Sequence, residues 1–291
     1  MIDPDSILNE LENVGRPELI ERLHKIYPTT DKETRIKFLT LLNRLRDNQH
    51  FDKVENYFIS DEDAEVRIEA AKLLAFNYNC KKAIKPLIWV IENELDLDVQ
   101  LTALRLLVAL WHRDEFKDKI RDTLLEFLKS REPKLKMEVI QSIGILKIKS
   151  AAEELIALLH ADKKLVKLRA IQAIGKLGSI KAVPFLIESL GSESYDVWYF
   201  AFNALQKILD DKLSDLLIEK LKHTMKKEEE DYETALLQKG IIRALGEIGK
   251  KEVIGLISDF LESNYYFLES EAKQALGKID SEWKEKYRKL L

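Results

Sequence analysis

Apolar and small residues recur along this chain at helical spacing, and the same arrangement returns every 31 to 36 residues, with one step of 40. In the copy VKLRAIQAIGKLG at 166–178, Val166, Ala170, Ala173 and Leu177 fall on one face. This stripe predicts an amphipathic helix whose small residues let a neighbouring helix come close. The equivalent first positions of the copies are Thr34, Val66, Val99, Leu135, Val166, Val197, Leu237 and Leu268.

A second amphipathic segment precedes each of these helices, for example AIKPLIWVI (83–91), AAEELIALL (151–159) and AVPFLIESL (182–190). The unit is therefore a helical hairpin of about 31 residues. One hairpin cannot bury its apolar face alone, so neighbouring hairpins must stack to form the core. The predicted N-cap residues of the second helices are Asp31, Asp63, Asp96, Ser194 and Thr234.

Two glycines interrupt the copy at 166–178. Gly175 lies nine positions after Val166, and Gly144, Gly246 and Gly277 occupy the same place in other copies. Since glycine costs about 1 kcal/mol in a helix, we interpret this row as a notch that makes room for a neighbour or a ligand. Gly178 follows the last periodic apolar residue and is predicted to end the helix as its C-cap.

The pattern V-R-x-x-A-x-x-[AL]-[LI]-G-x-[IL]-G, preceded by A-x-x-P-L-I, resembles the HEAT-repeat family in the short variant that is also found in bilin-lyase-like proteins. It is carried best by residues 166–178 with 182–190, by 66–75 with 83–91, and by 237–249, and the resemblance covers about residues 16–280. It implies an all-α fold, a right-handed α-α superhelix (a HEAT-repeat solenoid) of about eight helical hairpins with terminal capping helices.

We expect one solenoid domain over residues 1–291, with N-terminal capping helices within 1–30 (at 5–14 and 17–27), stacked repeats at 31–280 and a C-terminal cap at 281–291. In that cap, Trp283, Tyr287 and Leu290 share one face. The step of 40 residues holds an extra segment, 221–234, which we interpret as a lengthened first helix followed by a charged loop.

Composition narrows the class of protein. Apolar residues make up 46% and charged residues 34%, with a net charge of −4, which gives no general electrostatic reason for binding nucleic acid. The single cysteine, Cys80, excludes an intramolecular disulfide. The first residues lack the pattern of a secretory signal, and no apolar run reaches the ~18 residues of a membrane span. We therefore expect a monomeric, cytoplasmic protein that does not bind membranes.

Catalytic motifs are sparse. The five histidines are scattered, and the His-Glu pairs on which HEAT-repeat di-iron hydroxylases depend do not occur; one Glu-x-x-His pair, Glu21 and His24, is too few for a di-iron bundle. No phosphate-binding or dinucleotide glycine motif is present. We expect no catalytic residue, metal or cofactor, and we interpret the histidines as exposed. HEAT-like DNA glycosylases use tryptophans and an aspartate on the concave face, and candidates here are Trp111, Trp198, Asp114 and Asp196.

The second helices of such a solenoid line its concave side. Two, five and six positions after each first position, three rows of residues point away from the core on a helical wheel, and the row at +2 is apolar where the family usually has a polar residue. The predicted partner-binding residues are Ile36, Ile68, Leu101, Leu104, Arg105, Met137, Gln141, Leu168, Gln172, Tyr199, Asn203 and Arg243. Two alternatives are that supercoiling buries the +2 row between hairpins, or that the row pairs two copies of the chain.

These observations favour a non-enzymatic scaffold or adaptor that binds a peptide or helix of a partner protein on its concave face. One alternative is a HEAT-like protein that binds nucleic acid or repairs DNA, with contacts from Lys72, Arg105, Lys239, Arg243 and Lys273. Another is a bilin-lyase-like enzyme, for which no diagnostic residue is present.

Overall fold

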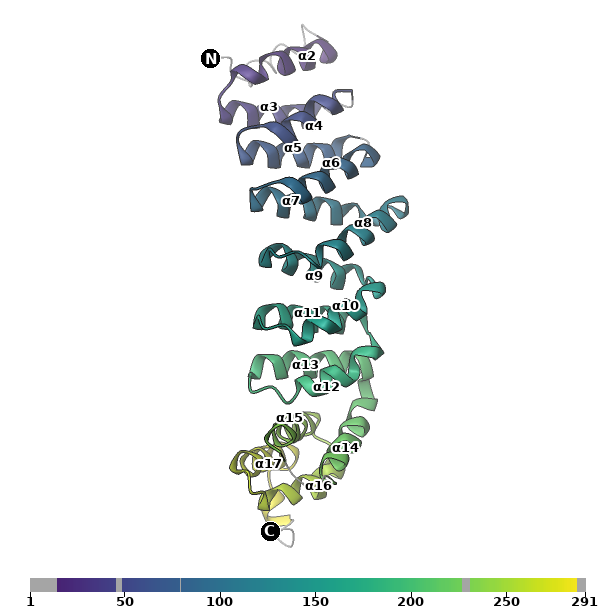
Figure 1. Ribbon diagram of the computed structural model, residues 1–291, viewed down its shortest axis with the longest axis vertical. Helices are drawn as coiled ribbons and strands as arrows, with labels where there is room; N and C mark the ends of the chain where they lie inside the picture. The colour runs from purple at the N-terminus through teal and green to yellow at the C-terminus, as the bar shows by residue number, and fades with distance from the viewer. Residues whose placement is uncertain (1–14, 46–48, 79, 227–230, 287–291) are drawn as a thin grey trace. The chain divides into compact units, whose positions relative to one another are not determined.

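The computed structural model describes residues 15–45, 49–78, 80–226 and 231–286, and these residues form helices joined by short connections (Figure 1). The helices are α2 (Arg16–Ile26), α3 (Lys32–Leu45), α4 (Phe51–Ser60), α5 (Ala64–Asn77), α6 (Cys80–Asn93), α7 (Leu97–Ala109), α8 (Asp114–Phe127), α9 (Pro133–Leu146), α10 (Ala152–Ala157), α11 (Lys164–Leu177), α12 (Val183–Ser189), α13 (Tyr195–Leu209), α14 (Leu213–Thr224), α15 (Tyr232–Ile248), α16 (Ile254–Ser258), α17 (Tyr266–Ile279) and α18 (Trp283–Lys286). No strand occurs in these four ranges, as the all-α prediction requires.

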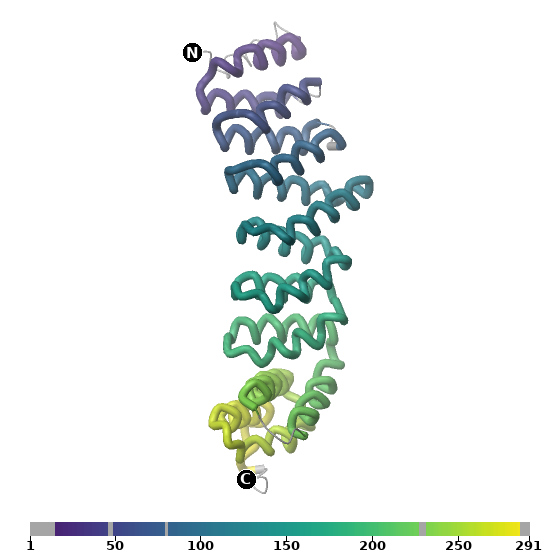
Figure 2. The backbone as a smooth tube through the Cα atoms, viewed as in Figure 1, coloured from purple at the N-terminus to yellow at the C-terminus, as the bar shows by residue number. Residues whose placement is uncertain are grey.

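The chain divides into two compact units, residues 1–139 and 140–291, and the boundary falls within α9. In the first unit α4 pairs with α5 and α6 with α7, while in the second unit α10 pairs with α11, α12 with α13, α14 with α15 and α16 with α17. Figure 2 shows the hairpins of each unit following one another in chain order. The second helix of one hairpin packs on that of the next, as α5 does on α7 and α11 on α13. This repeated arrangement is that of a helical solenoid, which confirms the predicted architecture.

The predicted terminal caps are only partly described. The segment 5–14, Tyr287 and Leu290 lie outside the described residues. Residues 17–27 form α2 and the start of a short turn, and α2 packs on α3 as the first helix of a hairpin. Trp283 at the other end is 4% exposed, as expected for a residue that covers the core.

Carboxylates begin the second helices where the sequence predicts them. Asp63 accepts a hydrogen bond from the backbone N–H of Glu65 at 2.9 Å, and Asp31 accepts one from Thr34 at 2.8 Å. The N-cap prediction at Thr234 is wrong, because α15 begins earlier: Asp231 is the N-cap residue, and its carboxylate accepts the N–H of Thr234 at 2.6 Å. The step of 40 residues therefore includes an early start of α15.

Gly178, Gly175 and Gly246 have the two roles that the sequence predicts, whereas the notch prediction is wrong at Gly277, where an added Cβ would meet no atom within 4 Å. Gly178 ends α11 with a φ of 68°, in the left-handed region that glycine tolerates, and its N–H bonds the carbonyl of Ile174. A Cβ on Gly175 would lie 3.1 Å from the Cα of Ala204 in α13, and one on Gly246 would lie 2.9 Å from the Cα of Ala275 in α17. At both positions, therefore, the missing side chain lets a helix of the next repeat pack closely.

The second unit changes direction between α13 and α15. In Figure 1, α15 and α17 are seen close to end-on, whereas α11 and α13 lie across the view. At the change of direction, the backbone of α15 at Gly240 meets the end of α12 so closely that a Cβ there would lie 2.5 Å from the carbonyl carbon of Leu190. The Trp198 indole donates a hydrogen bond to the Gly240 carbonyl at 2.9 Å, which joins α13 to α15.

Candidate functional site

The apolar +2 row is half-buried on the second-helix face. Ile36, Ile68, Leu101 and Met137 in the first unit and Leu168 in the second are partly exposed, and Tyr199 is 45% exposed. The row is therefore not sealed between hairpins within either unit. Leu104, which the sequence assigns to the same surface, is 0% exposed. That assignment is wrong, because Leu104 packs in the core, as do Leu39 and Ala71 of the same +5 row.

Two predicted partner-binding arginines clamp neighbouring second helices together. Arg105 of α7 donates two hydrogen bonds to Glu138 of α9, at 2.8 and 3.1 Å. Arg243 of α15 donates two to Glu271 of α17, at 2.9 and 2.5 Å. Both arginines lie at +6 in their repeats and both glutamates at +3 in the next, so this is the same bidentate interaction made twice. The hydrogen bonds from Glu138 raise the pKa of the Arg105 guanidinium.

Three other predicted residues converge on one cleft. Gln172 of α11 and Tyr199 and Asn203 of α13 line a cleft of about 400 Å³ between these two helices. The Asn203 amide is fixed by a hydrogen bond to the Tyr199 carbonyl at 2.8 Å, and the Gln172 side chain accepts one from Arg169 at 3.2 Å. The remaining lining residues are Gly175, Lys176, Phe200, Ala204 and Lys207. Gln141, by contrast, is an exposed residue of α9 that does not line this cleft.

Aromatic residues extend from this cleft along α13. Tyr195 is 59% exposed and stacks on Trp198 at 5.6 Å and on Tyr199 at 6.1 Å between ring centroids. The Arg243 guanidinium lies over the Trp198 ring, 5.2 Å from its centroid. Trp198 itself is 2% exposed, so of these three stacked aromatic residues Tyr195 and Tyr199 are the two that solvent reaches.

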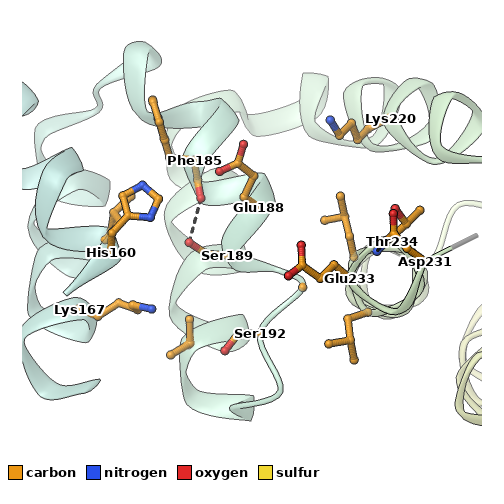
Figure 3. Close-up of a pocket in the computed structure, with 15 residues that line it drawn as sticks. His160, Lys167, Phe185, Glu188, Ser189, Ser192, Lys220, Asp231, Glu233 and Thr234 are labelled. Carbon is orange, nitrogen blue, oxygen red and sulfur yellow. Dashed lines mark hydrogen bonds between the residues drawn. The ribbon is translucent and has the colours of Figure 1, made fainter. Parts of the chain in front are cut away.

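A larger cleft of about 620 Å³ lies at the change of direction in the second unit, and the sequence analysis missed it (Figure 3). It is lined by Leu159, His160, Lys167, Phe185, Glu188, Ser189, Gly191, Ser192, Val197, Lys220, Asp231, Glu233, Thr234, Leu236 and Leu237. Figure 3 shows His160 and Lys167 on one side and Glu233 of α15 on the other. Charges of both signs therefore face this space. The signal that could have located it is the step of 40 residues, which shifts α15 out of register with α13.

The residues considered for base excision are engaged in the fold. Trp198 is buried and bonds Gly240, while the carboxylate of Asp196 pairs with Lys164 at 2.6 Å. Asp114 pairs with Lys117, also at 2.6 Å. Both candidate aspartates are therefore paired with a lysine, and Trp198 is buried, so these candidates include no exposed tryptophan beside an unpaired carboxylate.

His24 corrects the interpretation of the histidines as exposed. Its ring is 5% exposed, its Nδ1 lies 3.0 Å from the Tyr57 hydroxyl, and it packs on His50 at 4.6 Å between centroids. Burial raises the pKa of Tyr57 to about 12. Within the described residues, no group of three His, Cys, Asp or Glu side chains is placed to hold a metal ion.

Comparison with known proteins identifies the repeat. Residues 152–236 match the family model of HEAT repeats, which confirms the resemblance inferred from the sequence. No curated protein matches the chain. The segment from α10 to the start of α15 is therefore similar to HEAT repeats, and the helical hairpins of both units form an all-α solenoid fold.

Three solved structures are similar to this chain at low identity, and one of them has a TM-score above 0.5. YibA of Escherichia coli is 19% identical, with a TM-score of 0.51 over 94% of this chain and 97% of that one. The complex of CpcE and CpcF of phycocyanin lyase from Nostoc is 20% identical, with a TM-score of 0.45 over 80% and 88%. Human deoxyhypusine hydroxylase is 15% identical, with a TM-score of 0.39 over 93% and 99%. In the described part of this chain, no helix is long and apolar enough to span a bilayer.

Proposed function

We propose that this protein is a non-enzymatic scaffold that binds a peptide or helix of a partner protein on its second-helix face, and that the cleft between α11 and α13 is part of the contact. The observation that carries the proposal is the convergence of Gln172, Tyr199 and Asn203 on that cleft. Amide side chains supply donors and acceptors for a peptide backbone, and an exposed tyrosine supplies apolar contact area at a small entropic cost.

The nucleic-acid alternative has less support. Of its five candidate cations, Lys72 pairs with Glu69, Arg105 with Glu138, Arg243 with Glu271 and Lys273 with Glu269. A cation already paired with a carboxylate gains little by meeting a phosphate, because that contact must first break the existing pair. The single solenoid domain over 1–291, the monomeric state and the cytoplasmic location stay predictions.

Selection from a displayed library of random 16-residue peptides tests the proposal. We expect the protein to enrich a family of peptides and the variant Tyr199→Ser to bind them about tenfold more weakly, because removal of a central aromatic contact typically costs more than about 1 kcal/mol. The matched control is Tyr266→Ser, which removes another tyrosine of the second unit, 81% exposed and outside the cleft.

Two outcomes would contradict the proposal. The first is that no peptide family is enriched by the intact protein. The second is that the enriched peptides bind Tyr199→Ser and Tyr266→Ser equally well, since the peptide would then lie elsewhere on the surface. Circular dichroism of both variants confirms that the helical fold is retained.

A further inference from the structure

The second helices α11 and α13 carry an excess of positive charge in a chain whose net charge is −4. The sequence of α11, KLVKLRAIQAIGKL, contains no acidic residue. That of α13, YDVWYFAFNALQKIL, contains one, Asp196, which pairs with Lys164 at 2.6 Å and does not line the cleft. Among the described residues that line the cleft between these helices, none is acidic, whereas the chain as a whole has more acidic than basic residues.

Lys176 and Lys207 bring this charge to the cleft. Each lies ten positions after the first position of its repeat, so adjacent helices present them at the same level. Both are exposed and line the cleft, and neither makes an ion pair within the described part of the chain. At the equivalent places in the next two repeats, Glu247 and Lys278 neutralise each other at 2.5 Å. Two lysines without an ion pair at this level therefore distinguish the α11–α13 cleft from the corresponding place between α15 and α17.

The rest of the lining suits a peptide. Tyr199 and Phe200 offer ring surface, the two amides offer hydrogen bonds, and a volume of about 400 Å³ is within the range of ligand clefts. Two lysines match two carboxylates better than a nucleic-acid strand, which needs a longer track of cations along its phosphates. The arginine of the neighbouring second helix, Arg243, is already held by Glu271.

We propose that the α11–α13 cleft selects an acidic segment of a partner protein, in which an apolar side chain packs on Tyr199 and flanking Asp or Glu carboxylates pair with Lys176 and Lys207. This inference rests on the proposed function, because it names the chemistry of the peptide that the scaffold binds. Charge complementarity of this kind fixes which partner is accepted more than it adds affinity.

The test compares charge-reversal variants in the same 16-residue library selection. The double variant Lys176→Glu/Lys207→Glu reverses the charge of the cleft. The matched control Lys149→Glu/Lys212→Glu makes the same net change at two exposed lysines of the second unit that lie outside the cleft. We expect the intact protein and the control to enrich peptides rich in Asp and Glu, and the cleft variant to lose that preference.

A synthetic peptide from the enriched family then gives the affinity by fluorescence anisotropy. We expect the peptide to bind the cleft variant with a Kd about tenfold or more above its Kd for the intact protein. Replacing the Asp and Glu residues of the peptide by Asn and Gln should have a similar effect, and added salt should weaken binding of the peptide to the intact protein. A 20-nucleotide thymidine strand is the nucleic-acid probe, and we expect it to bind more weakly than the peptide.

The outcomes separate this inference from the proposed function. If peptides are enriched and need Tyr199 but show no acidic preference, or bind the cleft variant and the control equally, the scaffold function stands and the acidic partner is wrong. If the thymidine strand binds more tightly than the peptide and depends on the same lysines, the cleft binds nucleic acid and the acidic partner is again wrong. If no peptide is enriched, both are overturned.

Discussion

Replacing Gly240 by alanine tests the packing at the change of direction in the second unit. The new Cβ would lie 2.5 Å from the carbonyl carbon of Leu190 and would overlap its oxygen. Backbone atoms cannot rotate out of the way as a flexible side chain can, so α15 must move away from the end of α12. That movement stretches the 2.9 Å hydrogen bond from the Trp198 indole to the Gly240 carbonyl, and Trp198 is too buried to find water instead.

The expected change is a loss of about 3 kcal/mol in the free energy of unfolding. Overpacking of this kind costs about 1–3 kcal/mol, and a buried donor left without its acceptor costs a similar amount. Alanine returns about 1 kcal/mol through its better helix propensity. The steric and hydrogen-bond costs together exceed this gain, so the substitution should destabilise the protein although Gly240 lies within a helix.

Urea denaturation followed by circular dichroism at 222 nm measures the effect. The matched control is Gly277→Ala in α17, where an added Cβ meets nothing within 4 Å, so that helix propensity alone should stabilise the protein by about 1 kcal/mol. Because repeat proteins can unfold in parts, the two variants are compared on the same transition. The reasoning is refuted if Gly240→Ala is as stable as Gly277→Ala.

Three further predictions, made with four substitutions, test the fold. Arg243→Ala should lower the free energy of unfolding by about 3–5 kcal/mol, because it leaves the carboxylate of Glu271, which is 5% exposed, without its partner. Arg105→Ala should lower it by less than about 1 kcal/mol, because the Arg105 side chain is 60% exposed. Equal losses for the two variants in urea denaturation would contradict this prediction. Gly178→Ala should lower the free energy of unfolding by about 1–2 kcal/mol through the backbone strain of its φ of 68° alone, since a Cβ there meets no atom within 4 Å. An unchanged urea midpoint would contradict this prediction and show that the end of α11 adapts. Tyr57 has a pKa raised from 10 to about 12, so its hydroxyl holds the proton more tightly in the folded state than in the unfolded state. The protonated Tyr57 therefore contributes fully to the free energy of unfolding below pH 10, and this contribution is lost as the pH rises toward 12. Tyr57→Phe should therefore flatten the fall of stability between pH 10 and 12, and an unchanged pH slope would contradict the assignment.

The one-dimensional pattern was sufficient for the repeat. Ala170 and Ala173 mark the buried face of α11, Asp63 marks the start of α5 and Gly178 marks the end of α11, because each of these roles depends on neighbours within a few residues along the chain. Leu104 shows where such reasoning stops. A helical wheel places it away from its own hairpin, but its side chain is completely buried in the folded stack.

The candidate site shows the same division. The sequence places Gln172, Tyr199 and Asn203 on one surface, and the structure places them in the cleft between α11 and α13. It also selects Arg105 and Arg243 as surface cations, without showing that Glu138 and Glu271 of the following repeats already hold them. Those partners lie 33 and 28 residues away, and only the stacking of hairpins brings them within reach.

The sequence by itself determined the helical hairpin, its repetition and the positions of the glycines within and at the ends of the second helices, since helix periodicity, capping and glycine conformation are local properties. The tertiary structure decided what the local pattern leaves open: that alanines of the next helix pack against Gly175 and Gly246, that α15 turns away from α13, and that Lys176 and Lys207 line one cleft with no carboxylate among its described lining residues. Those outcomes depend on the distance and angle between helices from different repeats, which are set by packing across the stack and not by any single stretch of residues.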